Sequence, residues 1–362
     1  MKQGNNIAYL RQLCNLGLGR EIVIPEFLKA VQAVIPSGNN FFTGTNRQGL
    51  PSYVLTELFV PNLQDVGADV MPRFFTPEKM AAICDYCSRY SAITDHRILD
   101  RQFFQTEFYH HLWQPWSLYH FILAPIMVNR MMAGLFFLFR PHDVEPFTEE
   151  EEELCLQLLP YIAHALQEPK IKETKYVNSG QSSMIIADRD GGIAHLSASS
   201  RRLLSLVSGQ DANERSRVKK PVLPEAVVNL CRRLDGATGE EGFGPTIMTH
   251  TNAVGRFVFR VYPLDRADNG PNAFIGITID HQEPLPLKIA RNLQFLPLSV
   301  TEKEATLLWV QGHSYESVAQ QLHIRSTTAR SHIRNIYVKL KIKSRAQLRA
   351  KLMPEKEIGG IF

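Results

Sequence analysis

Apolar residues recur at helical spacing near the C-terminal end of the chain. Neighbouring residues of a helix are rotated by about 100°, so intervals of three and four keep side chains on one face. Over 327–340 the apolar members, at intervals of four, three and four, are Ala329, Ile333, Ile336 and Leu340. Facing away from this stripe are Thr327, Ser331, Arg334, Asn335 and Val338, with Arg330 on the flank. The pattern predicts an amphipathic helix with an exposed polar side.

The residues around this helix predict three more helices. Thr301 and Glu304 fit the S/T-x-x-E capping box that begins a helix, and Gly312 suits the positive φ that often ends one. Ser314 is placed to cap the next helix. The expected helices are 298–310, 315–322, 327–340 and 344–353, with a short turn, 323–326, before the third. This order predicts a helix-turn-helix unit over 296–353.

The first 168 residues mix helical and alternating patterns. Residues 41–58 alternate around a glycine-containing turn, which predicts a hairpin. Acidic residues 149–153 open a long amphipathic pattern that reaches residue 166, and acidic side chains are favourable at the start of a helix. The other expected elements are helices over 7–18, 22–35 and 77–90 and strands over 118–128 and 132–140. We therefore expect an α+β domain over 1–168.

A second α+β domain is expected over 182–284. The polar stretch 169–182 has the composition of a linker. Residues 183–206 then combine a strand, an Asp-Gly-Gly turn, a second strand and a helix, and further strands begin at Phe257 and Phe274. Residues 208–244 are charged and irregular. The prolines of 281–286 mark the end of the domain, before a short helix over 287–296.

Composition is that of a globular chain without a membrane span. The 362 residues, 44% hydrophobic and 21% charged, suffice for two or three domains. The longest apolar stretch, 131–139, is far shorter than the roughly 20 residues that cross a bilayer, and no signal peptide is recognised at the start. Five scattered cysteines do not suggest a disulfide framework. We expect a cytoplasmic protein with no membrane partner.

Positive charge is concentrated at the C-terminal end. Residues 298–353 contain ten Lys and Arg against three acids, a net charge of +7, whereas residues 1–297 carry −2. The whole chain carries +4, so the excess lies in about its last sixth. A basic unit of this kind is the electrostatic footprint of a DNA-binding module.

The segment 298–348 resembles the LuxR-type (NarL/FixJ-type) DNA-binding domain of bacterial transcription regulators. Three positions depart from the family pattern: His323 replaces a glycine, Arg325 replaces the capping serine and Ala329 replaces a valine, so Ser326 is an alternative cap. The positions that carry the resemblance are Leu298, Thr301, Glu304, Gly312, Ala319, Leu322, Ile324, Thr328, His332, Ile336, Lys339, Leu340, Ser344 and Arg345. The resemblance implies a homodimer that binds double-stranded DNA.

The resemblance also assigns roles to single residues of the polar helix. It places Arg330, Ser331 and Arg334 against base edges, where guanidinium and hydroxyl groups read sequence. The remaining assignments, to phosphate contacts or to holding the turn, are Thr327, Thr328, Asn335 and Lys339.

The two front domains resemble sensor modules. Residues 1–168 are similar to a GAF-type domain, particularly over 135–166, and residues 182–284 resemble a PAS-type domain. The fold class is therefore α+β, with GAF-like and PAS-like sensor domains followed by an all-α, four-helix helix-turn-helix domain. The resemblance implies that one face of a sheet serves either as a pocket for a small-molecule effector or as a dimer surface. The aromatic run 103–121 has two interpretations, a core or a ligand pocket. The pocket candidates are Phe104, Tyr109, Trp113, Trp116 and Tyr119.

Chemistry-bearing motifs are few. Cys84 and Cys87 form a C-x-x-C pair that zinc could share with His110 and His111, but no second pair is present, so we expect no metal site. The chain lacks a phosphate-binding G-x-x-x-x-G-K-[ST] loop, a G-x-S-x-G elbow and an H-E-x-x-H motif. The sequence favours a transcription regulator without catalytic residues or a cofactor. The alternative is a hydrolase or other ligand-processing enzyme with a DNA-binding tail.

Overall fold

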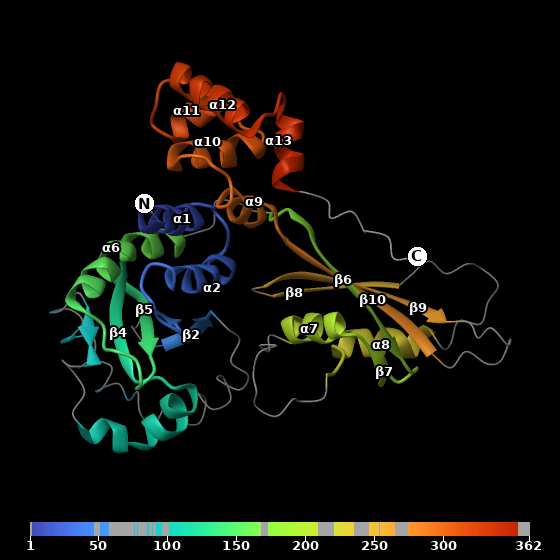
Figure 1. Ribbon diagram of the computed structural model, residues 1–362. Helices are drawn as coiled ribbons and strands as arrows, with labels where there is room; N and C mark the ends of the chain where they lie inside the picture. Colours follow the sequence, from blue (N-terminus) through green and yellow to red (C-terminus); the bar gives the residue numbers. More distant parts are fainter. Residues whose placement is uncertain are drawn as a thin grey trace. The chain divides into compact units, whose positions relative to one another are not determined.

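In the computed structural model, the chain forms two compact units (Figure 1). The first unit consists of Met1–Glu173 and Leu293–Lys341, and the second consists of Thr174–Asn292 and Ile342–Phe362. The structure describes residues 2–46, 51–57, 76, 78, 85–86, 89, 92–95, 101–167, 173–208, 221–234, 246–252, 254–264 and 274–353.

The first unit contains an antiparallel sheet. Its described strands pair in the order β2-β1-β5-β4-β3. Their bounds are β1 Phe41–Thr45, β2 Pro51–Thr56, β3 Ile93–Thr94, β4 His120–Val128 and β5 Met131–Arg140. The hairpin expected over 41–58 is confirmed by the β1–β2 pairing, and the strands expected over 118–128 and 132–140 are confirmed as β4 and β5.

Alternation along the strands gives this sheet two buried faces. Phe136 and Leu138 of β5 point to one face, where Phe136 meets Phe27 edge-on at 6.0 Å. Leu135, Phe137 and Phe139 point to the other. The helices in contact with the first face are α2, Arg20–Val31, and α6, Glu149–Ala165, and α1, Lys2–Cys14, packs on both of them (Figure 1). On the other face, Trp113 and Trp116 pack against the cluster that contains Leu135 and Phe139.

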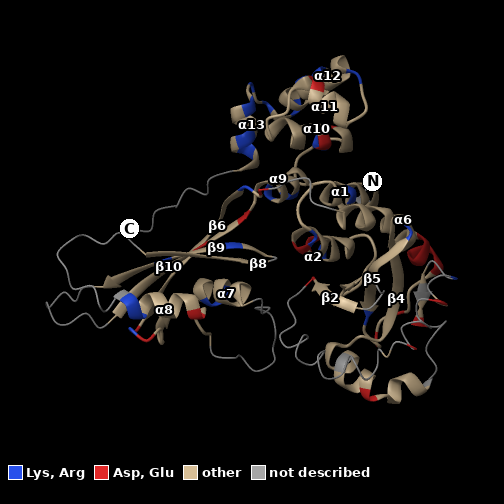
Figure 2. Cartoon of the chain, turned by 180° about the vertical axis from the view of Figure 1, so that it is seen from behind, with Lys and Arg blue, Asp and Glu red and all other residues tan. Residues whose placement is uncertain are grey.

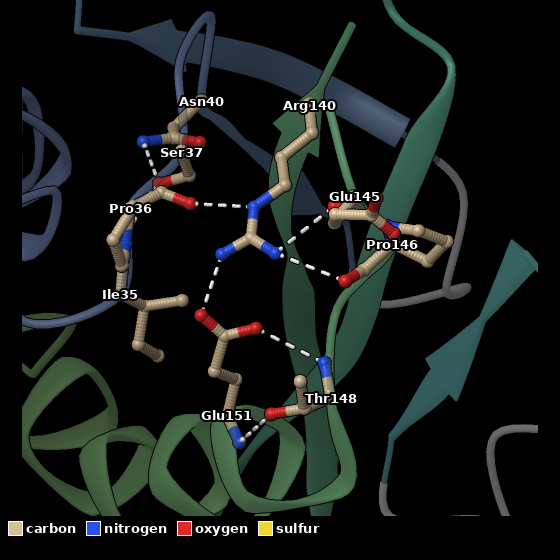
Figure 3. A network of polar contacts seen from close by, with 9 residues as sticks. All are labelled: Ile35, Pro36, Ser37, Asn40, Arg140, Glu145, Pro146, Thr148 and Glu151. Atoms are coloured by element: carbon tan, nitrogen blue, oxygen red, sulfur yellow. Dashed lines mark hydrogen bonds and ion pairs between the residues drawn. The ribbon is translucent and has the colours of Figure 1, made fainter. Parts of the chain in front are cut away.

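Arg140 joins three segments at the end of β5. Its Nε donates to the Pro36 carbonyl at 2.8 Å, and its Nη1 donates to the carbonyls of Glu145 and Pro146 at 3.2 and 3.1 Å (Figure 3). Its Nη2 contacts a Glu151 carboxylate oxygen at 2.5 Å. The other oxygen of Glu151 accepts from the Thr148 backbone N–H, which completes a capping box at the start of α6. The guanidinium thereby holds the start of α6, which lies where the acidic sequence pattern predicted.

The second unit contains another antiparallel sheet, with the described strands in the order β7-β6-β10-β9-β8. When the described strands of each unit are numbered in chain order from its first strand, both sheets have the order 2-1-5-4-3. The strands are β6 Tyr176–Ala187, β7 Ile193–Leu196, β8 Thr246–Asn252, β9 Gly255–Leu264 and β10 Phe274–Pro284. Helices α7, Ala198–Val207, and α8, Glu225–Leu234, pack on one face over a core that includes Phe257, Phe259 and Ile277.

Two expectations for the second unit are wrong. Residues 176–182 are not linker, because they pair with β10 as the first half of β6. The exit expected at 281–286 is confirmed, since β10 ends at Pro284 and the short helix α9, Leu285–Leu293, follows it. The interval 208–244 contains the helix α8, which we did not expect. The strand–turn–strand–helix order of 183–206 and the strands at Phe257 and Phe274 are confirmed.

No described helix combines the length and the apolar character needed to cross a membrane. The helix expected over 77–90, with Cys84 and Cys87, lies outside the residues that the structure describes, apart from single positions.

Candidate nucleic-acid interface

The C-terminal part of the chain is helical, as the sequence predicted. Helix α10 begins after Ser299, whose hydroxyl accepts from the Glu302 backbone N–H while the Glu302 carboxylate accepts from the Ser299 N–H at 2.7 Å. The capping box expected at Thr301 and Glu304 is therefore wrong by two residues, because Ser299 has the extended backbone of a cap. The helices are α10 Val300–Val310, α11 Tyr315–Gln321, α12 Ser326–Leu340 and α13 Arg345–Leu352.

The turn between α11 and α12 is tight. Gly312 has φ of +105° after α10, and Ser314 caps α11 by accepting from the Ser317 N–H, both as expected. His323, which stands where the resembled family has glycine, adopts φ of +52°. Arg325 occupies the cap position of α12 without a side-chain cap hydrogen bond, and Ser326 is the first helical residue rather than the alternative cap.

Helix α12 divides into a buried and an exposed side. The buried residues are Ala329, Ile333, Ile336 and Leu340, which confirms the predicted stripe. On the other side, the side chains predicted to meet DNA are exposed, namely Thr327, Thr328, Arg330, Ser331, Arg334, Asn335 and Lys339. Contacts of α12 with α10 and α11 hold this side outward within the first unit.

Arg330 is held by two neighbouring residues of α11. Its guanidinium carbon lies 5.0 Å from the centre of the Tyr315 ring, and its Nη2 lies 3.5 Å from a Glu316 carboxylate oxygen. Hydrogen bonds from the Glu316 backbone N–H and the Ser314 hydroxyl lower the pKa of the Glu316 carboxyl, and Arg330 adds to this effect. Sequence reasoning missed both residues because periodicity within one helix does not register contacts with the preceding helix.

Two other side chains predicted to contact DNA already have partners within the domain. The Ser331 hydroxyl donates to the Thr327 carbonyl at 3.1 Å, which leaves its oxygen able to accept. The Lys339 ammonium donates to the Glu302 carboxylate at 2.7 Å, so it joins α12 to the start of α10. Lys339 therefore has a structural partner that the sequence did not indicate.

Basic residues also follow one another beyond α12. Figure 2 shows blue Lys and Arg segments along α13. In the first unit, the first turn of α6 is acidic and is drawn in red. The exposed basic positions after α12 are Lys341, Lys343, Arg349 and Lys351.

The predicted ligand-pocket residues belong to an aromatic cluster in the first unit. Phe104 stacks on Tyr119 at 4.5 Å, and Tyr109 meets Phe104 edge-on at 5.1 Å. Burial, with the nearby Tyr119 phenol second, raises the pKa of Tyr109. The structure thus brings three of the five candidates into direct contact.

The two tryptophans lie against the sheet. The ring centre of Trp113 lies 5.4 Å from that of Phe121 and 5.2 Å from that of Phe139. Both tryptophans pack against the buried cluster that contains these two phenylalanines. The Trp116 carbonyl accepts from the Asn39 side chain at 2.7 Å. These contacts fit the core interpretation for Trp113 and Trp116.

Three cysteines and one histidine–aspartate pair outside these clusters are buried. Among the described residues, no group of three or more His, Cys, Asp or Glu side chains is placed to hold a metal ion. Cys14, Cys155 and Cys231 are buried free thiols, and burial raises the pKa of each. Buried His120 contacts the Asp95 carboxylate at 2.8 Å.

Comparison with known proteins identifies a family for the helical segment. Residues 296–351 match the model of the family described as bacterial regulatory proteins, luxR family. No curated protein matches the chain. Similar solved structures include VqmA bound to DPO, with 14% identity over 51% of this chain and 86% of that one and a TM-score of 0.20. A Vibrio cholerae VqmA dimer has 15% identity, coverages of 48% and 83%, and a TM-score of 0.19. The sensor region of a sensor histidine kinase has 15% identity, coverages of 44% and 63%, and a TM-score of 0.20. The segment 296–351 is a helix-turn-helix domain of the LuxR family of bacterial regulatory proteins.

Proposed function

We propose that this protein is a transcription regulator that binds specific double-stranded DNA through α12. The observation that carries the proposal is the exposed side of α12 within a LuxR-family domain. Its arginines are long enough to reach base edges in the major groove, which admits a helix. The proposal assigns no catalytic residue.

Individual contacts follow from the side chains on that face. Arg330 and Arg334 carry the planar, multiple donors that bind guanine, and the Ser331 oxygen remains able to accept. Thr327, Thr328 and Asn335 are short polar groups suited to phosphates, which fix position without reading sequence. For Lys339, a phosphate contact competes with the ion pair to Glu302.

The protein acts as a homodimer in this proposal. A single helix reads only a few base pairs, whereas two domains on adjacent half-sites double the base contacts and the neutralised phosphates. The front domains, GAF-like over 1–168 and PAS-like over 182–284, act as the sensor region that controls whether two domains bind together.

A small-molecule effector is part of the proposal, with the aromatic cluster of the first unit as its site. Phe104, Tyr109 and Tyr119 are half-buried rather than fully enclosed, so a ligand has access to their rings. Native mass spectrometry of the purified protein tests for a co-purified molecule. A mass excess that disappears in Tyr119→Ala, while the variant keeps its circular dichroism spectrum, is the expected result.

Binding to selected DNA tests the central proposal. The wild-type protein would be used to enrich duplexes from a random pool, and dissociation constants would then be measured for the enriched duplex. We expect Arg334→Ala to weaken binding by about 5- to 150-fold, since a good bidentate base contact is worth about 1–3 kcal/mol. Arg201→Ala removes an exposed arginine from α7 and serves as the charge-matched control. Equal loss in both variants, or no enrichment by the wild type, would contradict the proposal.

A further inference from the structure

The contacts of Arg330 indicate a role for helix α11 that rests on the proposed function. An arginine side chain has many rotamers, and ordering it on binding costs conformational entropy. In this domain the guanidinium already has two partners on one side, the Tyr315 ring and the Glu316 carboxylate. The side chain is nevertheless 62% exposed, so its remaining donors face solvent rather than the domain interior.

Tyr315 packs its ring against Trp309 of α10. Its ring lies 4.5 Å from the ring of Trp309, with an angle of 31° between the planes. Trp309 is only 8% exposed, and its Nε1 donates to the Tyr337 hydroxyl at 2.9 Å. A continuous series of contacts therefore runs from α12 through α10 and α11 and returns to α12 at Arg330. The ring that faces Arg330 has little freedom to move away.

Glu316 acts on Arg330 by charge. Its carboxylate is exposed and contacts both Arg330 and the Ser326 hydroxyl at 3.5 Å. An exposed pair of this length contributes little to folding stability. Near a DNA backbone, however, the same carboxylate repels phosphates. Arg330 therefore stays near Glu316 until a base edge whose acceptors match the guanidinium donors replaces that contact. A phosphate that offers no such base contact is repelled by the Glu316 carboxylate.

We propose that Tyr315 and Glu316 are positioning residues for Arg330, which set the direction of its guanidinium and thereby increase discrimination between the specific duplex and other DNA. Tyr315 supplies the direction through its ring face. Glu316 penalises binding that lacks the base contact. The quantity affected is the specificity ratio, which is the dissociation constant for a scrambled duplex divided by that for the enriched duplex.

The experiment measures this ratio for the full-length protein by fluorescence anisotropy at one salt concentration. We expect Tyr315→Ala to lower the ratio about three- to fivefold, the size of an exposed cation–π contact, mainly by weakening the enriched duplex. Tyr315→Phe keeps the ring face and retains the ratio. Glu316→Gln lowers the ratio by tightening binding to the scrambled duplex. Gln320→Ala, an exposed change one turn further along α11, leaves both constants unchanged.

Combination with Arg330→Ala separates positioning from folding. If the α11 residues act through Arg330, Tyr315→Ala and Glu316→Gln have no further effect on the ratio in the Arg330→Ala background. A full additional loss there would overturn the inference, as would an unchanged ratio in Arg330→Ala itself. Both results leave the proposed function standing if Arg334→Ala still weakens the enriched duplex. Absence of binding by the wild type is the separate failure of the proposed function.

Discussion

Lys339 and Glu302 form a 2.7 Å ion pair between the C-terminal half of α12 and the first turn of α10. The Glu302 side chain is only 5% exposed, whereas that of Lys339 is 45% exposed. The same carboxylate accepts from the Ser299 backbone N–H, so one side chain caps α10 and anchors α12. The orientation of the proposed DNA-reading helix therefore depends on this carboxylate.

Glu302→Gln should destabilise the DNA-binding domain by about 1–2 kcal/mol, since it removes the ion pair and weakens the cap. Burial raises the pKa of the Glu302 carboxyl, but hydrogen bonds from Lys339 and Ser299 outweigh it, and the net pKa is lowered. Because the folded value lies below the unfolded one, the stabilisation is present above about pH 4.3 and is lost as pH falls through the folded value.

Urea denaturation at pH 7 and at pH 3.5 checks this expectation, followed by the fluorescence of Trp309 in a background where Trp113 and Trp116 are replaced by phenylalanine. The difference in free energy of unfolding between wild type and Glu302→Gln should be smaller at the lower pH. Glu153→Gln, an exposed change on α6, is the matched control. A difference that stays constant with pH would show that the carboxylate charge does not provide the stabilisation.

Arg140→Met should destabilise the first unit by about 3–5 kcal/mol, because it leaves buried partners of a charged group unpaired. The guanidinium side chain is 8% exposed and has partners in three segments (Figure 3). By contrast, Arg89→Met removes an exposed ion pair with Asp85, and we expect a change below about 1 kcal/mol. Chemical denaturation followed by circular dichroism provides both values. Similar losses in the two variants would contradict the role given to Arg140.

The sequence predicted what depends on local pattern and missed what depends on contacts between distant segments. The buried stripe of α12 follows directly from the spacing of Ala329 to Leu340. The pairing of residues 176–182 with β10 was missed, because the partner strand lies about a hundred residues away. The partners of Arg330 and Lys339 were missed for the same reason, since Glu316 and Glu302 belong to other helices. The exposed face of the site was predictable, but its supports were not.

Gly255→Ala should destabilise the second unit by about 1–3 kcal/mol through backbone strain and steric conflict. Gly255 has φ of +150°, and a Cβ there would lie 2.4 Å from the Gln282 carbonyl oxygen and 2.6 Å from His281 Nε2. Gly38→Ala is the control, because no atom lies within 4 Å of its Cβ position. Thermal unfolding compares the two variants. An unchanged midpoint for Gly255→Ala would show that β9 and β10 separate there without cost.

Affinity for the enriched duplex should fall steeply as salt rises, because each neutralised phosphate contributes a slope of about −0.9 to log K against log salt. Lys339→Gln then distinguishes the two roles of its ammonium. Since Glu302 already neutralises that charge, we expect the slope to stay within error of wild type while the domain loses stability. Isothermal salt titrations of wild type, Lys339→Gln and the exposed-site variant Lys341→Gln check this. A slope smaller by about 0.9 per protomer in Lys339→Gln would instead make Lys339 a phosphate contact, and a flat wild-type titration would contradict binding in the groove.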